Sequence, residues 1–277
     1  MYSLERKVLI VTGAGSGMGR EMTLQLINKG VKVAACDINE KTLEETKTLV
    51  SNPKLIKTYV LNVADKESVL SFPKTVKEDF GALHGVINNA GIIQPFVKFM
   101  ELPEASIERV MNINFFGLMN LTRAVINELN TDTDTFIVNV SSMGGFLPVP
   151  GQGIYGASKA AVKLFTEALY AEMQGTRVHV SVVFPGAVAT NISENSMGNN
   201  AAANSENKKS AQQNSEASYK TTSADVAAEI IINGIEAGKV KIFVGKDAVM
   251  MDRMYRLMPV KSINMMAKMI NKMTAQK

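Results

Sequence analysis

Short runs of apolar and β-branched residues alternate along this chain with longer segments whose apolar positions recur at the period of a helix. Runs of the first kind predict buried strands, and segments of the second kind predict amphipathic helices. The expected strands lie within 7–13, 31–37, 56–62, 83–91, 135–142, 178–186 and 240–245. The expected helices lie at 18–29, 39–50, 65–79, about 103–130, 153–174 and 223–237.

Seven strands joined by crossover helices imply a parallel sheet with helices on both faces. We therefore expect an α/β chain with a three-layer Rossmann fold, built on a doubly wound seven-stranded parallel sheet. This pattern accounts for the length as a single domain over residues 1–277.

One segment interrupts the alternation: residues 194–218 lack large apolar side chains apart from Met197. Such a segment cannot bury enough surface by itself to offset the entropy lost on ordering. A linker between domains is one interpretation, but one helix and one strand are too little to form a second domain. We favour a substrate lid at about 190–222.

The C-terminal extension, at about 246–277, is rich in methionine. A helix over 262–273 would place on one stripe Ile263, Met266, Ala267, Ile270 and Met273. The favoured interpretation is a helix packed on its own or a neighbouring subunit. A pliable cover over an apolar substrate and a peripheral membrane contact remain alternatives.

Composition excludes several classes of function. One cysteine and two histidines give no disulfide and no zinc-ligand cluster, so no metal is expected. The net charge of +4 is spread along the chain, which argues against a nucleic-acid partner. No window approaches the ~18 apolar residues of a membrane span, so we expect no integral membrane segment and a cytoplasmic location.

The stretch VLIVTGAGSGMGRE leads from a predicted strand into a predicted helix through Gly13, Gly15, Gly17 and Gly19. Glycines let the backbone approach a pyrophosphate, whose charge is favoured at a helix N-terminus. The spacing differs from G-x-G-x-x-G and lacks the Gly-Lys-Ser/Thr of an ATP-binding loop. Asp37 ends the second strand, where a carboxylate binds ribose hydroxyls and repels a 2′-phosphate, which favours NAD over NADP.

Six motifs resemble those of the short-chain dehydrogenase/reductases in their single-domain form: TGAGSGMG at 12–19, NNAG at 88–91, NINFFG at 112–117, NVSS at 139–142, YGASK at 155–159 and PGAVAT at 185–190. The resemblance covers nearly the whole chain. It implies a catalytic tetrad of Asn114, Ser142, Tyr155 and Lys159. Ser142 is chosen over Ser141 because it lies 13 residues before Tyr155, the separation typical of that family.

The chemistry of the pair in YGASK agrees with that assignment. Hydride transfer to a ketone or from an alcohol needs an acid or base beside the substrate oxygen. A free tyrosine, with a pKa near 10, is a poor base at neutral pH. Lys159, one helical turn after Tyr155, is expected to stabilise the tyrosinate together with the positive nicotinamide ring of NAD⁺.

The resemblance also implies which residues bind the cofactor. They are Gly13, Ser16, Gly17, Met18, Gly19, Asp37, Asn62, Val63, Asn89, Ala90, Gly91, Tyr155, Lys159, Pro185, Gly186, Val188 and Thr190. Asn62-Val63 takes the place where the family usually has Asp-Val against the adenine, so the side chain there carries no charge.

These observations predict an oxidoreductase that moves a hydride between NAD(H) and a secondary alcohol or ketone. Apolar residues in SMGGFLPVPGQG and IIQPFVKF favour a largely hydrophobic substrate, although small polyols remain open. The long helices at about 103–130 and 153–174 resemble those that pair in family dimers and tetramers. Two alternatives are a catalytically silent nucleotide-binding regulator or scaffold, and a nucleotide-sugar epimerase or dehydratase of the extended branch.

Overall fold

The computed structural model describes residues 1–189, 192 and 221–274, without the side chains of the last two. These residues form one sheet of seven parallel strands in the spatial order β3-β2-β1-β4-β5-β6-β7. The strands are β1 (Val8–Thr12), β2 (Lys32–Asp37), β3 (Ile56–Val60), β4 (Gly85–Asn88), β5 (Thr135–Val140), β6 (Val178–Pro185) and β7 (Lys241–Val244). The predicted doubly wound parallel sheet is confirmed. Its order reverses between β1 and β4, where ligands bind in sheets of this kind.

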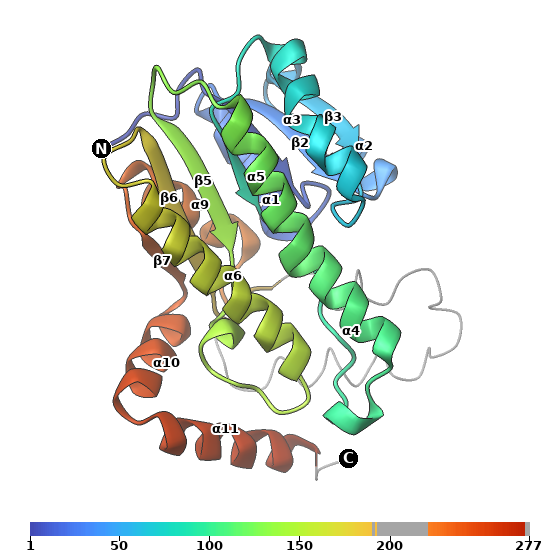
Figure 1. Cartoon of the computed structure of the whole chain (residues 1–277), viewed down its shortest axis with the longest axis vertical. Helices are drawn as coiled ribbons and strands as arrows, with labels where there is room; N and C mark the ends of the chain where they lie inside the picture. The colour runs from blue at the N-terminus through green and yellow to red at the C-terminus, as the bar shows by residue number, and fades with distance from the viewer. Residues whose placement is uncertain (190–191, 193–220, 275–277) are drawn as a thin grey trace.

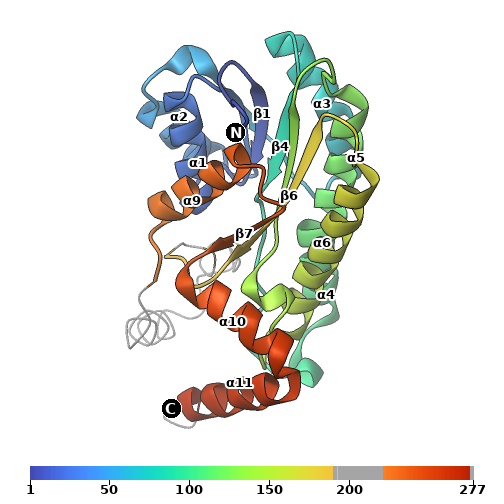
Figure 2. The ribbon, with the colours of Figure 1, turned by 90° about the vertical axis from the view of Figure 1, so that its left-hand side faces the viewer.

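Helices cover both faces of the sheet, as Figure 2 shows. One face carries α1 (Gly17–Asn28), α2 (Glu40–Leu49) and α9 (Ala224–Glu236), and the other carries α3 (Lys66–Phe80), α5 (Leu118–Glu128) and α6 (Gly153–Glu172). A cluster of buried apolar side chains fills the space on each face. Because the central strands are covered on both sides, every residue of β1 and β5 is buried, which explains their continuous apolar runs.

The helical segment predicted at about 103–130 is interrupted. It consists of α4 (Glu104–Met111), a π-helical turn η3 (Asn112–Gly117) and then α5. Single π-helical turns inside helices are frequent at functional sites, because they re-aim one side chain. Here the turn contains Asn114, which is fully buried.

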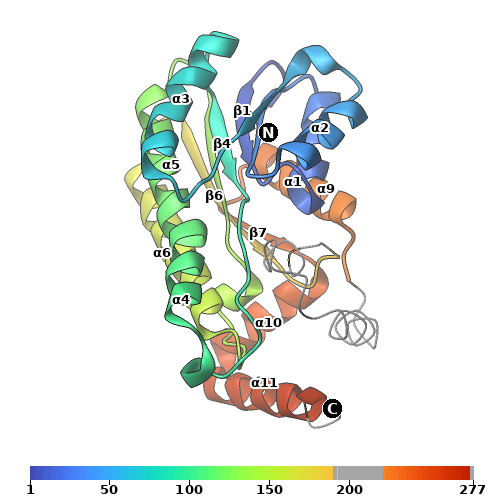
Figure 3. The same ribbon diagram turned by 90° about the vertical axis from the view of Figure 1, so that its right-hand side faces the viewer.

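The C-terminal extension forms two helices where the sequence predicted one. They are α10 (Lys246–Leu257) and α11 (Pro259–Thr274), and they lie beyond the carboxyl ends of the strands (Figures 1 and 3). Met251 of α10 and Met266 of α11 are buried together with Leu147.

The predicted apolar stripe on α11 is wrong in one residue. Met266 is buried, but Ile263 is 39% exposed. The contact face has Ser262 and Met266 buried and Met269 and Ile270 half-buried, because the surfaces of α10 and of the loop before α6 select it. The side chain of Met273 lies outside the described residues.

Three short 3₁₀ turns connect these elements: η1 (Pro53–Leu55), η2 (Phe99–Glu101) and η4 (Met143–Gly145). Of the predicted lid at 190–222, only residues 192, 221 and 222 lie within the described part of the chain.

Candidate active site

The glycine-rich turn between β1 and α1 folds tightly on itself. Gly13 and Gly17 have φ angles of +67° and +51°, which favour glycine. A Cβ atom on Gly19 would collide with the carbonyl oxygen of Gly13. Gly19 therefore lets α1 pack against the turn, and the N–H groups at the start of α1, which the Ser16 side chain does not cap, suit an anion.

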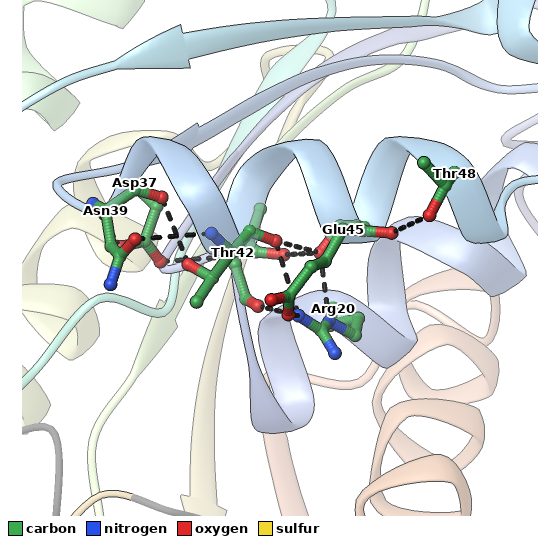
Figure 4. A network of polar contacts seen from close by, with 9 residues as sticks. Arg20, Asp37, Asn39, Thr42, Glu45 and Thr48 are labelled. Atoms are coloured by element: carbon green, nitrogen blue, oxygen red, sulfur yellow. Dashed lines mark hydrogen bonds and ion pairs between the residues drawn. The ribbon is translucent and has the colours of Figure 1, made fainter.

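Arg20 fastens helix α2 to this turn (Figure 4). One Nη atom donates to the carbonyl oxygens of Gly15 (2.5 Å) and Thr42 (3.3 Å) and forms an ion pair with Glu45 (3.0 Å). Its Nε donates to Thr46 Oγ1 at 3.0 Å. The planar guanidinium thus reaches both segments at once, which a lysine ammonium could not do. The sequence did not mark this role, because it depends on how α2 lies beside α1.

Asp37 faces the same turn from the end of β2. Its Oδ2 accepts the backbone N–H of Gly15 at 3.0 Å, and its Oδ1 accepts that of Asn39 at 3.1 Å. A carboxylate oxygen can accept more than one hydrogen bond, so both oxygens retain capacity for further donors. The two backbone bonds fix the orientation of the carboxylate at the mouth of a cleft.

That cleft contains most of the predicted cofactor residues. Those that line it are Gly13, Ser16, Gly17, Met18, Asp37, Asn62, Val63, Asn89, Ala90 and Gly91. The sequence reasoning missed Cys36, Ile38, Leu61, Ile92, Arg109, Ile113 and Ile192. Several of these are apolar neighbours of strand ends, whereas Arg109 and Ile113 come from α4 and η3, whose proximity no local pattern reveals.

The lining residues fit a dinucleotide. A cradle of glycines next to a helix N-terminus suits a pyrophosphate, and Asp37 with apolar neighbours suits an adenosine. Among the predicted cofactor residues, Gly19, Tyr155, Lys159, Pro185, Gly186 and Val188 are not part of this lining, and Thr190 lies outside the described residues.

The segment after β6 is held by α10. The backbone N–H of Ala187 donates to Asp247 Oδ2 at 2.7 Å, and a Cβ atom on Gly186 would collide with the same carboxylate. Val188 pairs with Thr222 in an isolated parallel bridge. Asp247 therefore fixes the backbone on which Pro185, Gly186 and Val188 are predicted to meet the cofactor.

Two motif asparagines are structural. Asn88 Nδ2 donates to Thr122 Oγ1 (2.9 Å) and to Asn139 Oδ1 (2.8 Å), and Asn139 Nδ2 donates to Thr166 Oγ1 (3.0 Å). All four side chains are buried, where unpaired polar groups would be costly. The ladder joins β4 and β5 to α5 and α6, and so sets the frame for the site.

Asn114 ties the π-helical turn to two other elements. Its Oδ1 accepts the N–H of Ile92 (2.8 Å), and its Nδ2 donates to Ile92 O (2.9 Å) and to Ser158 Oγ (3.1 Å). The loop after β4, the turn η3 and helix α6 therefore meet at one amide.

Lys159 is buried, with 3% of its surface exposed, and its Nζ donates to the carbonyl oxygen of Val140 at 3.0 Å. Burial lowers its pKa to about 8. A Cβ atom on Gly91 would lie 3.2 Å from that Nζ and 3.3 Å from Asn114 Oδ1. Lys159 and Asn114 thus lie beside the edge of the cleft marked by Gly91.

Tyr155 and Ser142 lie next to each other and to this ammonium, since a Cβ atom on Gly144 would lie 3.6 Å from both Ser142 Oγ and the Tyr155 ring. Burial raises the pKa of Tyr155, and the neighbouring Ser142 hydroxyl opposes that rise. Lys159 Nζ lies 6.0 Å from the centre of the Tyr155 ring. The sequence led us to expect a lowered tyrosine pKa. Burial outweighs the effect of Ser142, and Lys159 donates to Val140 O instead of to the phenol.

The two serines of NVSS have different partners. Ser141 Oγ is buried and donates to the carbonyl oxygen of Lys159 at 2.7 Å. Ser142 Oγ accepts the N–H of Gly144 at 3.1 Å, which leaves its own O–H free to donate elsewhere. The arrangement supports the choice of Ser142 as the serine beside Tyr155.

Within the described ranges, no group of three or more His, Cys, Asp or Glu residues could hold a metal ion. Nor does any helix in this part of the chain have the length and apolarity needed to cross a membrane.

Comparison with known proteins gives three relevant similarities. The family model described as short chain dehydrogenase matches residues 7–201. SadH of Mycobacterium tuberculosis, an inferred oxidoreductase, is 36% identical over 262 residues, which cover 93% of each chain. The 3-oxoacyl-[acyl-carrier-protein] reductase FabG of Thermotoga maritima is 34% identical over 192 residues, which cover 69% of this chain and 78% of FabG.

Among solved structures, a short chain dehydrogenase/reductase from Burkholderia phymatum in complex with NAD has a TM-score of 0.82 and 25% sequence identity. The match covers 92% of this chain and 95% of that chain. A nicotinamide cofactor is therefore supported for the cleft described above.

Proposed function

This chain belongs to the short chain dehydrogenase family, and from that premise we propose that it interconverts a secondary alcohol and a ketone with NAD(H) as cofactor. The observation that carries the proposal is the juxtaposition of Ser142 and Tyr155 around Gly144, with Lys159 buried 6.0 Å from the Tyr155 ring and beside the cleft. Three groups with proton-transfer or hydrogen-bonding chemistry meet where a substrate oxygen would have to lie.

The residues of the chain transfer the proton, and the bound cofactor supplies or accepts the hydride. Tyr155 gives its hydroxyl proton to the substrate oxygen in reduction and takes one in oxidation. Ser142, whose oxygen already accepts the N–H of Gly144, donates its O–H to the substrate oxygen and orients it. A positive charge near the phenol favours the tyrosinate, which offsets the effect of burial on the pKa of Tyr155.

Lys159 has a second proposed role. A lysine with a pKa of about 8 exchanges protons near neutral pH, so it can restore the protonation of Tyr155 after each cycle. By resemblance to the family, Asn114 helps to hold a water that links this lysine to solvent. Its amide is already fixed by Ile92 and Ser158, which suits a residue that must hold a position.

We propose NAD rather than NADP because Asp37 lies at the mouth of the cleft with both oxygens oriented by backbone N–H groups. Such a carboxylate bonds the ribose hydroxyls and repels a 2′-phosphate.

We propose a largely hydrophobic substrate. Met143 of η4, with Phe146 and Val149 after it, packs against the apolar cluster of Leu147, Met251 and Met266. Phe96 and Phe99, after Gly91, are 55% and 64% exposed. Apolar walls beside a few polar groups are typical of sites for such compounds.

The chain is further proposed to form a homo-oligomer through α5 and α6. A depression between these helices is lined by Met119, Ile126, Phe165 and Leu169 among others, and Leu164 next to it is 67% exposed. Light scattering checks this assembly, for which a monomer would be the contrary result. The proposed location is the cytoplasm, where Cys36, a buried free thiol, stays reduced.

The test of the proposed activity is a screen of secondary alcohols and ketones with NAD(H) and NADP(H), followed by absorbance at the reduced nicotinamide band. We expect turnover of apolar ketones with NADH. Binding of NADH without turnover of any compound would favour the silent regulator or scaffold. A preference for NADPH would overturn the role given to Asp37.

A further inference from the structure

A glutamine in the loop after β4 closes the first turn of helix α6. Gln94 is 5% exposed, and its Oε1 accepts the backbone N–H of Tyr155 at 2.8 Å. Its Nε2 donates to Gly151 O at 3.1 Å, just before the helix begins. The backbone oxygen of Gln94 in turn accepts the side-chain Nε2 of Gln152 at 3.1 Å.

These bonds replace a cap that α6 does not provide for itself. The first N–H groups of a helix have no partner within the helix and are usually satisfied by the residue that precedes it. Here that residue is Gln152, whose side chain makes no capping bond within the described structure and bonds Gln94 instead. Tyr155 is the third helical residue, the position that a capping side chain normally serves. Its partner comes from 61 positions earlier in the chain.

The loop that carries Gln94 also reaches the rest of the site. Gly91 and Ile92 line the cofactor cleft. The side-chain amide of Asn114 bonds both the N–H and the carbonyl oxygen of Ile92. Only Ile93 therefore separates a cleft residue, Ile92, from Gln94, whose side chain holds the backbone of Tyr155. A displacement of this loop would move the cleft edge and Tyr155 together.

We propose that Gln94 is a positioning residue for catalysis, which fixes Tyr155 relative to Ser142 and to the cofactor cleft. The catalytic part of this inference rests on the proposed function, whereas the contact itself does not. Removing the acceptor frees the first turn of α6, so the hydroxyl of Tyr155 loses its alignment with Ser142. A misplacement of about 1 Å can lower a rate ~100-fold.

The first test is amide hydrogen exchange in Gln94→Met, which keeps the length of the side chain and removes its polar atoms. We expect the Tyr155 amide to exchange about fivefold faster or more, as for loss of a hydrogen bond of typical strength. The matched control is Gln174→Met, which removes a bond from an exposed glutamine to Tyr170 O at the other end of α6. That control is expected to leave the Tyr155 amide unchanged. An unchanged amide in Gln94→Met would overturn the proposal, even if the chain turned over no substrate.

The second test uses the best substrate from the screen. We expect Gln94→Met to lower kcat by roughly 10- to 100-fold while the Kd for NADH stays within twofold of wild type. Because the nearby Ser142 hydroxyl lowers the pKa of Tyr155, moving the phenol away from Ser142 should move the acid limb of alcohol oxidation to higher pH. If the Tyr155 amide exchanged faster while kcat and the pH of the acid limb stayed as in wild type, Gln94 would have a structural role only. That result would contradict the inference.

Should Gln94→Met not fold, Gln94→Glu tests the same contact in the converse way. It keeps an acceptor oxygen for the Tyr155 N–H and loses the donor to Gly151 O. We expect slow exchange at Tyr155 and most of kcat to be retained in that variant. Fast exchange together with a full kcat in Gln94→Glu would overturn the proposal.

Discussion

Two regions at the carboxyl end of the sheet are built in opposite ways. The proposed catalytic region, hereafter the catalytic region, is defined by Asn114, Ser142, Tyr155 and Lys159. It holds polar and charged groups, of which Asn114 and Lys159 are buried. The apolar end, defined by Leu147, Met251 and Met266, buries only hydrocarbon and thioether groups. Burial lowers the pKa of Lys159 and raises that of Tyr155, so folding works against the charged form of each.

The difference suggests a division of labour. Burying polar groups costs free energy unless they are paired. The catalytic region therefore lowers the stability of the fold in order to hold reactive groups in place. The apolar end contributes packing and hydrophobic burial, and it positions the loop η4 that follows Ser142. Substitutions should therefore separate the two regions, with activity lost in one and stability lost in the other.

The largest effect is expected at the lysine of the catalytic region. Lys159→Met should lower kcat by about 10³-fold, because general acid–base function and the charge beside Tyr155 are both removed. Steady-state kinetics measures this loss. Lys163→Met, one turn further along α6 and paired with Glu167 at 2.9 Å, is the control and should keep kcat within about twofold. Equal losses in both variants would contradict the assignment.

The same substitution should affect stability in the opposite direction. The pKa of Lys159 falls from 10.5 to about 8 on folding, so below pH 8 the folded chain bears the cost of a buried ammonium. Between pH 8 and 10.5 the unfolded chain binds more protons than the folded chain. The free energy of unfolding of the wild type therefore rises with pH in that window, and the advantage of Lys159→Met shrinks. At pH 7 the variant should be more stable by up to ~3 kcal/mol. Urea unfolding at pH 7 and pH 10 checks the sign.

Met266→Ala should weaken the apolar end without touching the chemistry. Met266 is 3% exposed, and truncating a buried methionine costs about 2 kcal/mol or more. The Kd for NADH is expected to stay unchanged, as measured by fluorescence titration. Met265→Ala, at a neighbouring position that is 41% exposed, is the matched control for stability. A loss of NADH binding in Met266→Ala would break the proposed division.

A smaller effect is expected at the adenosine end of the cleft. Asp37→Asn keeps the size of the side chain and removes its charge, so NAD should bind about tenfold more weakly. NADP should be rejected less strongly, because the repulsion of its 2′-phosphate is lost. The ratio of kcat/KM for the two cofactors measures this change. Glu40→Gln, an exposed acid at the start of α2, should leave the ratio as it is.

The smallest effect concerns the support of the glycine-rich turn. Arg20→Lys keeps the charge but cannot reach Gly15 O, Thr42 O and Thr46 Oγ1 together, so the Kd for NADH should rise about fivefold. Glu45→Gln removes only the ion pair with Arg20, and it should change Kd by less than twofold. Isothermal titration distinguishes the two. Equal effects would mean that the charge of the pair, and not the shape of the guanidinium, supports the turn.

The sequence predicted what local patterns carry. Apolar strand runs separated by crossover helices were enough to predict the parallel sheet. The order of six motifs was enough to predict that Ser142, Tyr155 and Lys159 lie close together. The role of Gln94 could not be predicted, since its partner is a backbone N–H from a distant helix. The face of α11 was predicted wrongly at Ile263 for a related reason: several methionines could have formed the stripe, and tertiary contacts made the choice.

Arg20 and Asp247 show the same limit. Each is a charged residue in a helix, where a solvated position is the ordinary expectation. Only the packing of α2 on the turn, and of α10 on the end of β6, turns them into supports for backbone segments of the site.

The central claim, that Tyr155 moves the proton while the glycine-rich cleft binds the cofactor, is tested most directly by one paired measurement on Tyr155→Phe. The Kd for NADH and the rate of ketone reduction are determined on the same preparation. We predict a Kd within about twofold of wild type and a rate reduced by at least ~10³-fold. Turnover comparable to wild type would contradict the account.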